Sequence, residues 1–75
     1  MARKTNGATI REIRKAIGIT QRDLAARVGI SAPALSQIES GAVQARDDTV
    51  SRIAGELGVP LDAITYPVTL EQVPA

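Results

Sequence analysis

The chain has 75 residues, enough for one domain with a small core, and it contains neither cysteine nor histidine. Disulfides, thiolate zinc sites and cysteine nucleophiles are therefore excluded and the commonest general base is missing, so we expect neither an enzyme nor a bound cofactor. The net charge of +1 conceals a segregation, because residues 1–46 carry a net charge of +5 and residues 47–75 a net charge of −4. This pattern is either ordinary solvated surface charge or a basic face that binds a polyanion.

The chain begins with a short polar segment, residues 1–7, that includes Arg3 and Lys4. This segment is too hydrophilic for a secretory signal, and no apolar run reaches the length of a membrane span, so we expect a cytoplasmic protein. Because seven residues are too few to fold alone, we predict a flexible basic arm. A first helix follows, since Ile10, Ile13 and Ile17 recur at helical spacing.

Two further helices are predicted from their capping residues. Thr20 is a candidate N-cap, with Asp23 three residues later, and Gly29 ends this second helix. Ser31 is the next N-cap after only two residues, and Pro33 lies in the first turn, where a missing N–H costs nothing. The apolar side chains that face inward from these helices are Leu24, Ala25, Val28, Leu35 and Ile38.

A loop follows the third helix, and after it the acidic pair Asp47 and Asp48 marks the start of a fourth helix. That pair is also the only basis for a carboxylate enzyme, which a helix start explains more simply. The inner face of the fourth helix consists of Val50, Ile53, Ala54 and Leu57. Pro60 then opens a short fifth turn.

The last residues change character. Tyr66, Val68 and Leu70 alternate with polar positions, which is the period of a strand, but Pro67 interrupts the pattern. The sequence therefore leaves two alternatives for the tail, a strand or a frayed extension.

The segment from Thr20 to Gly41 carries the functional information. Its third helix leaves one face outward that is uncharged, short and able to hydrogen-bond, consisting of Ala32, Pro33, Ser36, Gln37 and Ser40. A solvated helix in a generic αα-hairpin usually carries several Lys and Glu residues there. The composition instead favours a surface that enters a DNA groove.

Roughly residues 8–64 resemble the phage repressor and Cro (Xre-type) family of helix-turn-helix domains. The resemblance lies in Ile13-Arg14, in Gly18-Ile19-Thr20-Gln21-Arg22-Asp23-Leu24-Ala25, in Val28-Gly29-Ile30-Ser31, in Leu35-Ser36-Gln37-Ile38-Glu39-Ser40-Gly41 and in Ile53-Ala54-Gly55-Glu56-Leu57-Gly58-Val59. It implies an all-α, compact five-helix bundle with a short C-terminal extension, whose third helix, about residues 31–40, reads the major groove.

The resemblance also implies individual roles. Base contacts fall on Ala32, Pro33, Ser36 and Gln37, and phosphate contacts on Thr20, Gln21, Ser40 and Arg46. Gln37 is the best candidate for direct readout, because a carboxamide pairs bidentately with adenine. Ala32 and Pro33 are shorter or less polar than in relatives, which shifts specificity toward Gln37, Ser36 and DNA shape. Arg14 and Glu39 are expected to form a partly buried structural ion pair.

We therefore predict an arm over residues 1–7, a DNA-binding domain over residues 8–65 and a tail over residues 66–75 that is a possible dimerisation arm. The function implied is that of a homodimeric regulator, a repressor on an inverted-repeat operator, with no small-molecule effector and no membrane partner, associated with the nucleoid. Dimer contacts are expected from Leu61, Ile64, Tyr66, Val68 and Leu70. The arm either reaches DNA or has no function. The alternative is an antitoxin-like or anti-repressor module whose tail binds another protein as an added strand.

Overall fold

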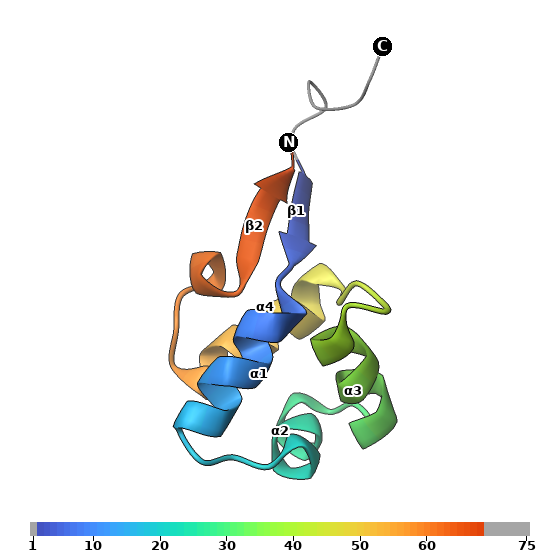
Figure 1. The fold of residues 1–75 in the computed structure, drawn as a ribbon, viewed down its shortest axis with the longest axis vertical. Helices are drawn as coiled ribbons and strands as arrows, with labels where there is room; N and C mark the ends of the chain where they lie inside the picture. Colours follow the sequence, from blue (N-terminus) through green and yellow to red (C-terminus); the bar gives the residue numbers. More distant parts are fainter. Residues whose placement is uncertain (1, 69–75) are drawn as a thin grey trace.

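The computed structural model describes residues 2–68. Its elements in chain order are β1 (Ala2–Thr5), α1 (Gly7–Ala16), α2 (Gln21–Val28), α3 (Ala32–Ser40), α4 (Asp47–Leu57), the 3₁₀ turn η1 (Leu61–Ala63) and β2 (Thr65–Val68). The helices form one bundle, and the two strands form a ribbon that projects from it (Figure 1). The helix-turn-helix fold class is confirmed, but the predicted fifth helix is a three-residue 3₁₀ turn. None of the helices within residues 2–68 is long and apolar enough to cross a membrane.

The capping predictions for α2 and α3 are confirmed. The Thr20 side chain accepts a hydrogen bond from the backbone N–H of Asp23 over 3.0 Å, and Ser31 accepts one from Ala34 over 3.1 Å. Each bond satisfies one of the N–H groups that a helix start leaves without a partner. Gly29, with φ of 87°, lies in the left-handed region and turns the chain between the two helices.

The apolar stripe predicted for α1 is wrong at its last position. Ile10 is fully buried and Ile13 is partly buried, but Ile17 is 50% exposed. The helix ends at Ala16, so Ile17 caps its C-terminal end instead of continuing the inner face, and Ile19 packs against the core from the following turn. At the other end of α1, Asn6 acts as the N-cap by accepting from the N–H of Thr9.

The core lies between the four helices and includes every inward position predicted for α2, α3 and α4. Its buried members are Ile10, Leu24, Ala25, Val28, Leu35, Ile38, Val50, Ile53, Ala54, Leu57 and Ile64. Ile64 was predicted as a dimer contact, but its exposed fraction is 0%. It packs into the core of its own chain, because the turn η1 folds back onto α4. Ile64 therefore offers no surface to a partner.

The two ends of the described chain pair as an antiparallel ladder. Thr5 lies opposite Thr65 and Lys4 lies opposite Tyr66. Residues 2–5 are thus a strand in this structure where the sequence led us to expect a flexible arm, because the alternating tail supplies a partner for their backbone groups. The tail is a strand over Thr65–Val68, while the predicted contact residue Leu70 lies outside the described residues. The division into arm, domain and tail stays a prediction.

The base of the ladder is bonded to the loop between α3 and α4. The N–H of Thr5 donates to the side-chain oxygen of Gln44 over 2.8 Å, and the N–H of Ala45 donates to the Thr5 hydroxyl over 3.2 Å. The N–H of Asn6 donates to the carbonyl of Ile64. These bonds fix the loop that follows α3 relative to both chain ends.

Candidate nucleic-acid interface

Helix α3 has one buried face and one exposed face. Leu35, Ile38 and Glu39 are buried, and the helix contacts both α1 and α2. Of the four predicted base-contact residues, Pro33, Ser36 and Gln37 are exposed, whereas Ala32 is partly buried against the core. The side chains of Ser36 and Gln37 make no hydrogen bond within the described part of the chain. The exposed face therefore presents polar groups that are available to a ligand.

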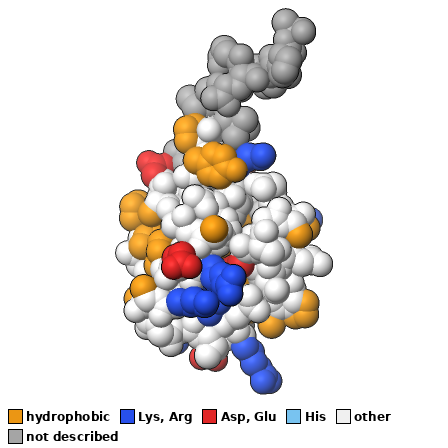
Figure 2. All heavy atoms as spheres, in the orientation of Figure 1, with side chains coloured by type: hydrophobic (Ala, Val, Ile, Leu, Met, Phe, Trp, Pro, Cys, Tyr) orange, Lys and Arg blue, Asp and Glu red, His pale blue; other side chains and the backbone are white. Residues whose placement is uncertain are grey.

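Charge is distributed unevenly around this helix. Glu39 is the one charged side chain of α3, and it is buried, so the outer face of α3 is neutral. Lys and Arg side chains gather over α1 instead (Figure 2). The arrangement sets a neutral helix face beside a basic one, as is suited to a groove bounded by phosphates.

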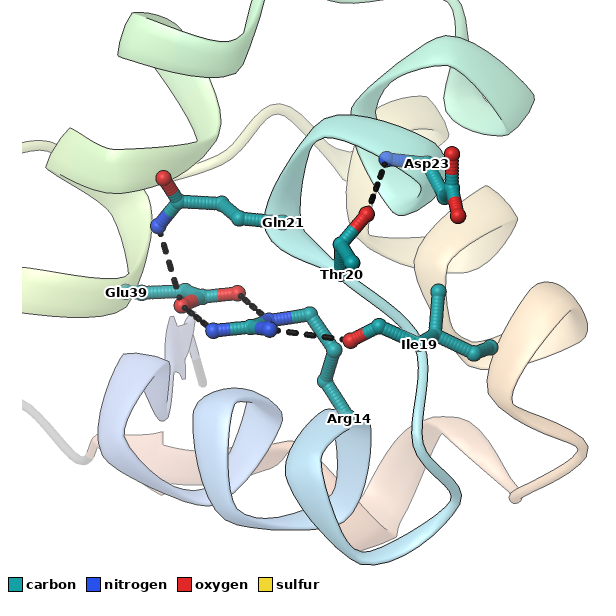
Figure 3. Close-up of polar contacts among 6 residues, drawn as sticks. All are labelled: Arg14, Ile19, Thr20, Gln21, Asp23 and Glu39. Atoms are coloured by element: carbon teal, nitrogen blue, oxygen red, sulfur yellow. Dashed lines mark hydrogen bonds and ion pairs between the residues drawn. The ribbon is translucent and has the colours of Figure 1, made fainter.

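A buried ion pair fixes α3 to α1 (Figure 3). Nε of Arg14 donates to Oε2 of Glu39 over 2.8 Å, and Nη2 donates to Oε1 over 3.0 Å. The side chains of Arg14 and Glu39 are only 9% and 2% exposed. The third nitrogen, Nη1, donates to the carbonyl of Ile19 over 2.9 Å, which also holds the turn before α2. The predicted pair is thus a bidentate contact that joins three segments of the bundle.

Gln21 belongs to the same network. Its Nε2 donates to Oε1 of Glu39 over 3.2 Å (Figure 3). A carboxylate only accepts hydrogen bonds, so this contact orients the amide with its nitrogen toward Glu39. An amide nitrogen carries two hydrogens, and the second is left for another acceptor. Sequence reasoning predicted Gln21 as a phosphate contact and missed its bond to Glu39.

The predicted phosphate-contacting residues do not form one cluster. Gln21 and Ser40 line the same hollow between α1, α2 and α3, together with Ser36, whereas Thr20 and Arg46 lie outside it. The Ser40 hydroxyl donates to the carbonyl of Gln37 over 3.1 Å, and the Thr20 oxygen is engaged as the cap of α2. Arg46 is exposed and directly precedes α4.

Arg11 is a residue that the sequence reasoning missed. It is exposed on α1 and lines the hollow with Gln21, Ser36 and Ser40. The available signal was its position three residues before Arg14, since residues three apart share a helix face. Once Arg14 was placed beside Glu39, this spacing could have indicated that Arg11 lies near α3 as well.

The acidic pair at the start of α4 acts as a helix start. Asp47 and Asp48 both lie in the first turn, and Oδ1 of Asp48 accepts from the N–H of Thr49 over 2.9 Å. Negative side chains at this position interact favourably with the helix dipole. Within residues 2–68, no group of three His, Cys, Asp or Glu side chains is placed to hold a metal ion.

The segment that contains the helix-turn-helix matches known proteins. A family model described as a helix-turn-helix matches residues 10–64. The uncharacterized HTH-type transcriptional regulators Mb0023 of Mycobacterium bovis and Rv0023 of Mycobacterium tuberculosis are each 38% identical over 60 residues, which is 80% of this chain and 23% of theirs. This chain thus spans about a quarter of the length of those relatives.

Solved structures show the same similarity. The clp gene regulator ClgR from Corynebacterium glutamicum superposes with a TM-score of 0.74 at 29% identity, over 76% of this chain and 62% of that one. The P22 c2 repressor, solved in complex with a synthetic operator, superposes with a TM-score of 0.73 at 29% identity, over 79% of this chain and 89% of that one.

Proposed function

Because the chain belongs to the Cro/C1-type helix-turn-helix family of DNA-binding transcription regulators, we propose that it is a sequence-specific repressor that binds an inverted-repeat operator as a homodimer. Each subunit places α3 in a major groove, and the two half-sites are centred about 34 Å apart, one turn of duplex. The similar P22 c2 repressor was solved with a synthetic operator, which supports this mode of action.

The observation that carries the proposal is the two-sided character of α3. Its inner face is held by the bidentate contact between Arg14 and Glu39. Its outer face is neutral, and the exposed side chains of Ser36 and Gln37 make no hydrogen bond within residues 2–68. A rigid helix with such a face loses little freedom on entering a groove, and its polar groups exchange water for base edges.

Base and phosphate contacts are divided between α3 and its neighbours in this proposal. Bases are contacted by Ala32, Pro33, Ser36 and Gln37, and phosphates by Thr20, Gln21, Ser40 and Arg46. The second N–H of Gln21 is directed by Glu39 and is suited to a phosphate oxygen. Ala32 and Pro33 offer only apolar contact, such as with a thymine methyl group.

Gln37→Ala is expected to relax preference at one base position by about 1–3 kcal/mol. The reason is that the exposed carboxamide is the longest uncharged polar side chain on the outer face of α3. Binding of the variant to operators that differ by single bases measures this. Its unfolding midpoint should match the wild type, because the side chain is exposed and makes no hydrogen bond within residues 2–68. An equal loss of affinity on every duplex would show that Gln37 does not read bases.

Selection of bound duplexes from a random-sequence pool tests the proposal as a whole. A two-fold symmetric motif with half-sites one helical turn apart is the expected result. Affinity for that motif should fall steeply with salt, because phosphate contacts release counterions. A pool without any enriched motif at low ionic strength would contradict sequence-specific binding.

The dimer contact is proposed around η1 and β2. Tyr66 of β2 is 44% exposed, and Leu61 of η1 is partly buried. Tyr66→Ala is expected to raise the dimer Kd at least tenfold, because a central tyrosine contributes more than 1 kcal/mol at an interface and a symmetric dimer loses it twice. Sedimentation equilibrium measures the change. Lys4→Ala, on the strand opposite Tyr66, is a control that removes no aromatic contact.

A second candidate function is the antitoxin-like or anti-repressor module. The observation in its favour is that, within residues 2–68, β1 and β2 form a two-stranded sheet. Each strand of this sheet has an outer edge to which an extended peptide can add. Tyr66→Ala discriminates between the two functions. Loss of self-association supports the dimer, whereas intact self-association with loss of a foreign partner supports the interaction module.

A further inference from the structure

The hollow between α1, α2 and α3 includes one residue, Arg11, that has none of the roles given above. Its lining consists of Arg11, Arg14, Gln21, Ser36, Glu39 and Ser40. These side chains come from three different helices, and Ser36 also belongs to the outer face of α3. A duplex that admits α3 into its major groove therefore brings one of its backbones toward this hollow, since the groove is bounded by phosphates.

The charges of the hollow do not cancel. Arg14 and Glu39 neutralise each other, and all three nitrogens of the Arg14 guanidinium donate to Glu39 or to the carbonyl of Ile19. Arg11 is exposed and makes no ion pair or hydrogen bond within residues 2–68. The hollow thus holds one cationic group whose five N–H donors are uncommitted.

The neutral donors face the same space. The amide of Gln21 is oriented by Glu39 and retains one N–H, and the hydroxyl of Ser36 has no partner in the described structure. Ser40 lines the hollow but gives its hydroxyl hydrogen to the carbonyl of Gln37. A group bound here meets a guanidinium, an amide N–H and a hydroxyl, which together suit the oxygens of a monoanionic phosphodiester.

We propose that this hollow binds one phosphate of the DNA backbone and that Arg11 supplies the charge of the site. The proposal rests on the proposed function, since it takes DNA as the ligand, and it adds a contact from α1 to those assigned to α2, α3 and the loop before α4. The bound phosphate lies beside the Arg14 and Glu39 pair, so the contact that locks α3 also shapes the site for the backbone.

The salt dependence of DNA binding tests this site. One phosphate contact contributes about 0.9 to the slope of log K against log salt. Arg11→Gln is therefore expected to reduce the magnitude of the slope by about 0.9 per bound subunit, which is about 1.8 for the homodimer, on a mixed-sequence duplex between roughly 50 and 200 mM salt. Arg11→Lys keeps the charge and should retain the wild-type slope. Because Arg11 is exposed, both variants should have the unfolding midpoint of the wild type.

Arg27→Gln is the matched control. It removes the same charge from the last turn of α2, away from the hollow, and should leave the slope unchanged. If Arg11→Gln and the wild type have equal slopes, or if Arg27→Gln lowers the slope as much, the phosphate site at Arg11 is refuted while DNA binding itself stands. If the wild type binds no duplex even at low salt, the proposed function fails and this site fails with it.

Discussion

Replacing Gly7 with alanine is expected to lower the free energy of unfolding by about 3 kcal/mol, at the upper end of overpacking costs. Gly7 is buried at the start of α1, and a Cβ there would overlap the carbonyl oxygen of Ile38 and lie 2.9 Å from that of Glu39. Both obstacles are backbone atoms of α3, which no side-chain rotation can move. Alanine favours a helix by up to about 1 kcal/mol over glycine, but this gain is smaller than the steric cost.

Thermal unfolding checks this expectation, with a midpoint lowered by roughly 12–24 °C for a domain of this size. Gly55→Ala is the matched control, because Gly55 lies on the exposed side of α4 and a Cβ there would meet nothing within 4 Å. That control should raise stability by about 0.5–1 kcal/mol. If Gly7→Ala proved as stable as the wild type, α1 would not approach α3 as closely as the structure indicates.

The close approach of α1 to α3 at Gly7 is a contact that the sequence alone could not predict. Glycine at a helix start is ordinary, and no local pattern indicates that it faces the backbone of another helix. Helix limits were predictable because their signals are local, as with the caps Thr20 and Ser31, whose side chains bond backbone groups three residues away. Contacts between α1 and α3 depend instead on the packed bundle.

The pairing of β1 with β2 was also not predictable from the sequence, and its partners lie further apart in the chain. Thr5 and Thr65 are opposite each other in the ladder but sixty residues apart in the chain. Arg3 and Lys4 give the first strand a polar composition that is typical of an unfolded arm, so only its partner makes it a strand. The alternation at Tyr66 and Val68 was visible, but a strand signal without a known partner does not identify one.

The sequence predicted most of the residues that belong to the candidate site, but few of the contacts between them. The resemblance to repressors placed Arg14 beside Glu39, and the structure adds that Gln21 and the carbonyl of Ile19 complete the same network. Arg11 escaped notice because an exposed arginine on a helix is usually solvated. Its meaning depends on Gln21 and Ser36, which reach the same hollow from other helices.

Glu39→Gln is expected to destabilise the fold by about 3 kcal/mol, the typical cost of breaking a buried ion pair. The substitution keeps the size of the side chain but leaves the Arg14 guanidinium, whose side chain is 9% exposed, without a counter-charge. The new glutamine has one carbonyl oxygen in place of two acceptors. Its NH2 group therefore faces either Nε of Arg14 or the N–H groups of Arg14 Nη2 and Gln21, all of which are donors. Denaturant unfolding measures the loss.

The double replacement of Arg14 by Met and Glu39 by Leu separates charge from packing. It leaves no uncompensated charge, so it should cost less than Glu39→Gln alone even though it removes more hydrogen bonds. Glu12→Gln, an exposed acid on α1, should change stability by no more than about 0.5 kcal/mol. A loss below about 1 kcal/mol for Glu39→Gln, as for exposed ion pairs, would mean that water reaches the pair. In that case α3 would be held mainly by its apolar side chains, Ala32, Leu35 and Ile38, and the amide of Gln21 would no longer be directed by a fixed carboxylate.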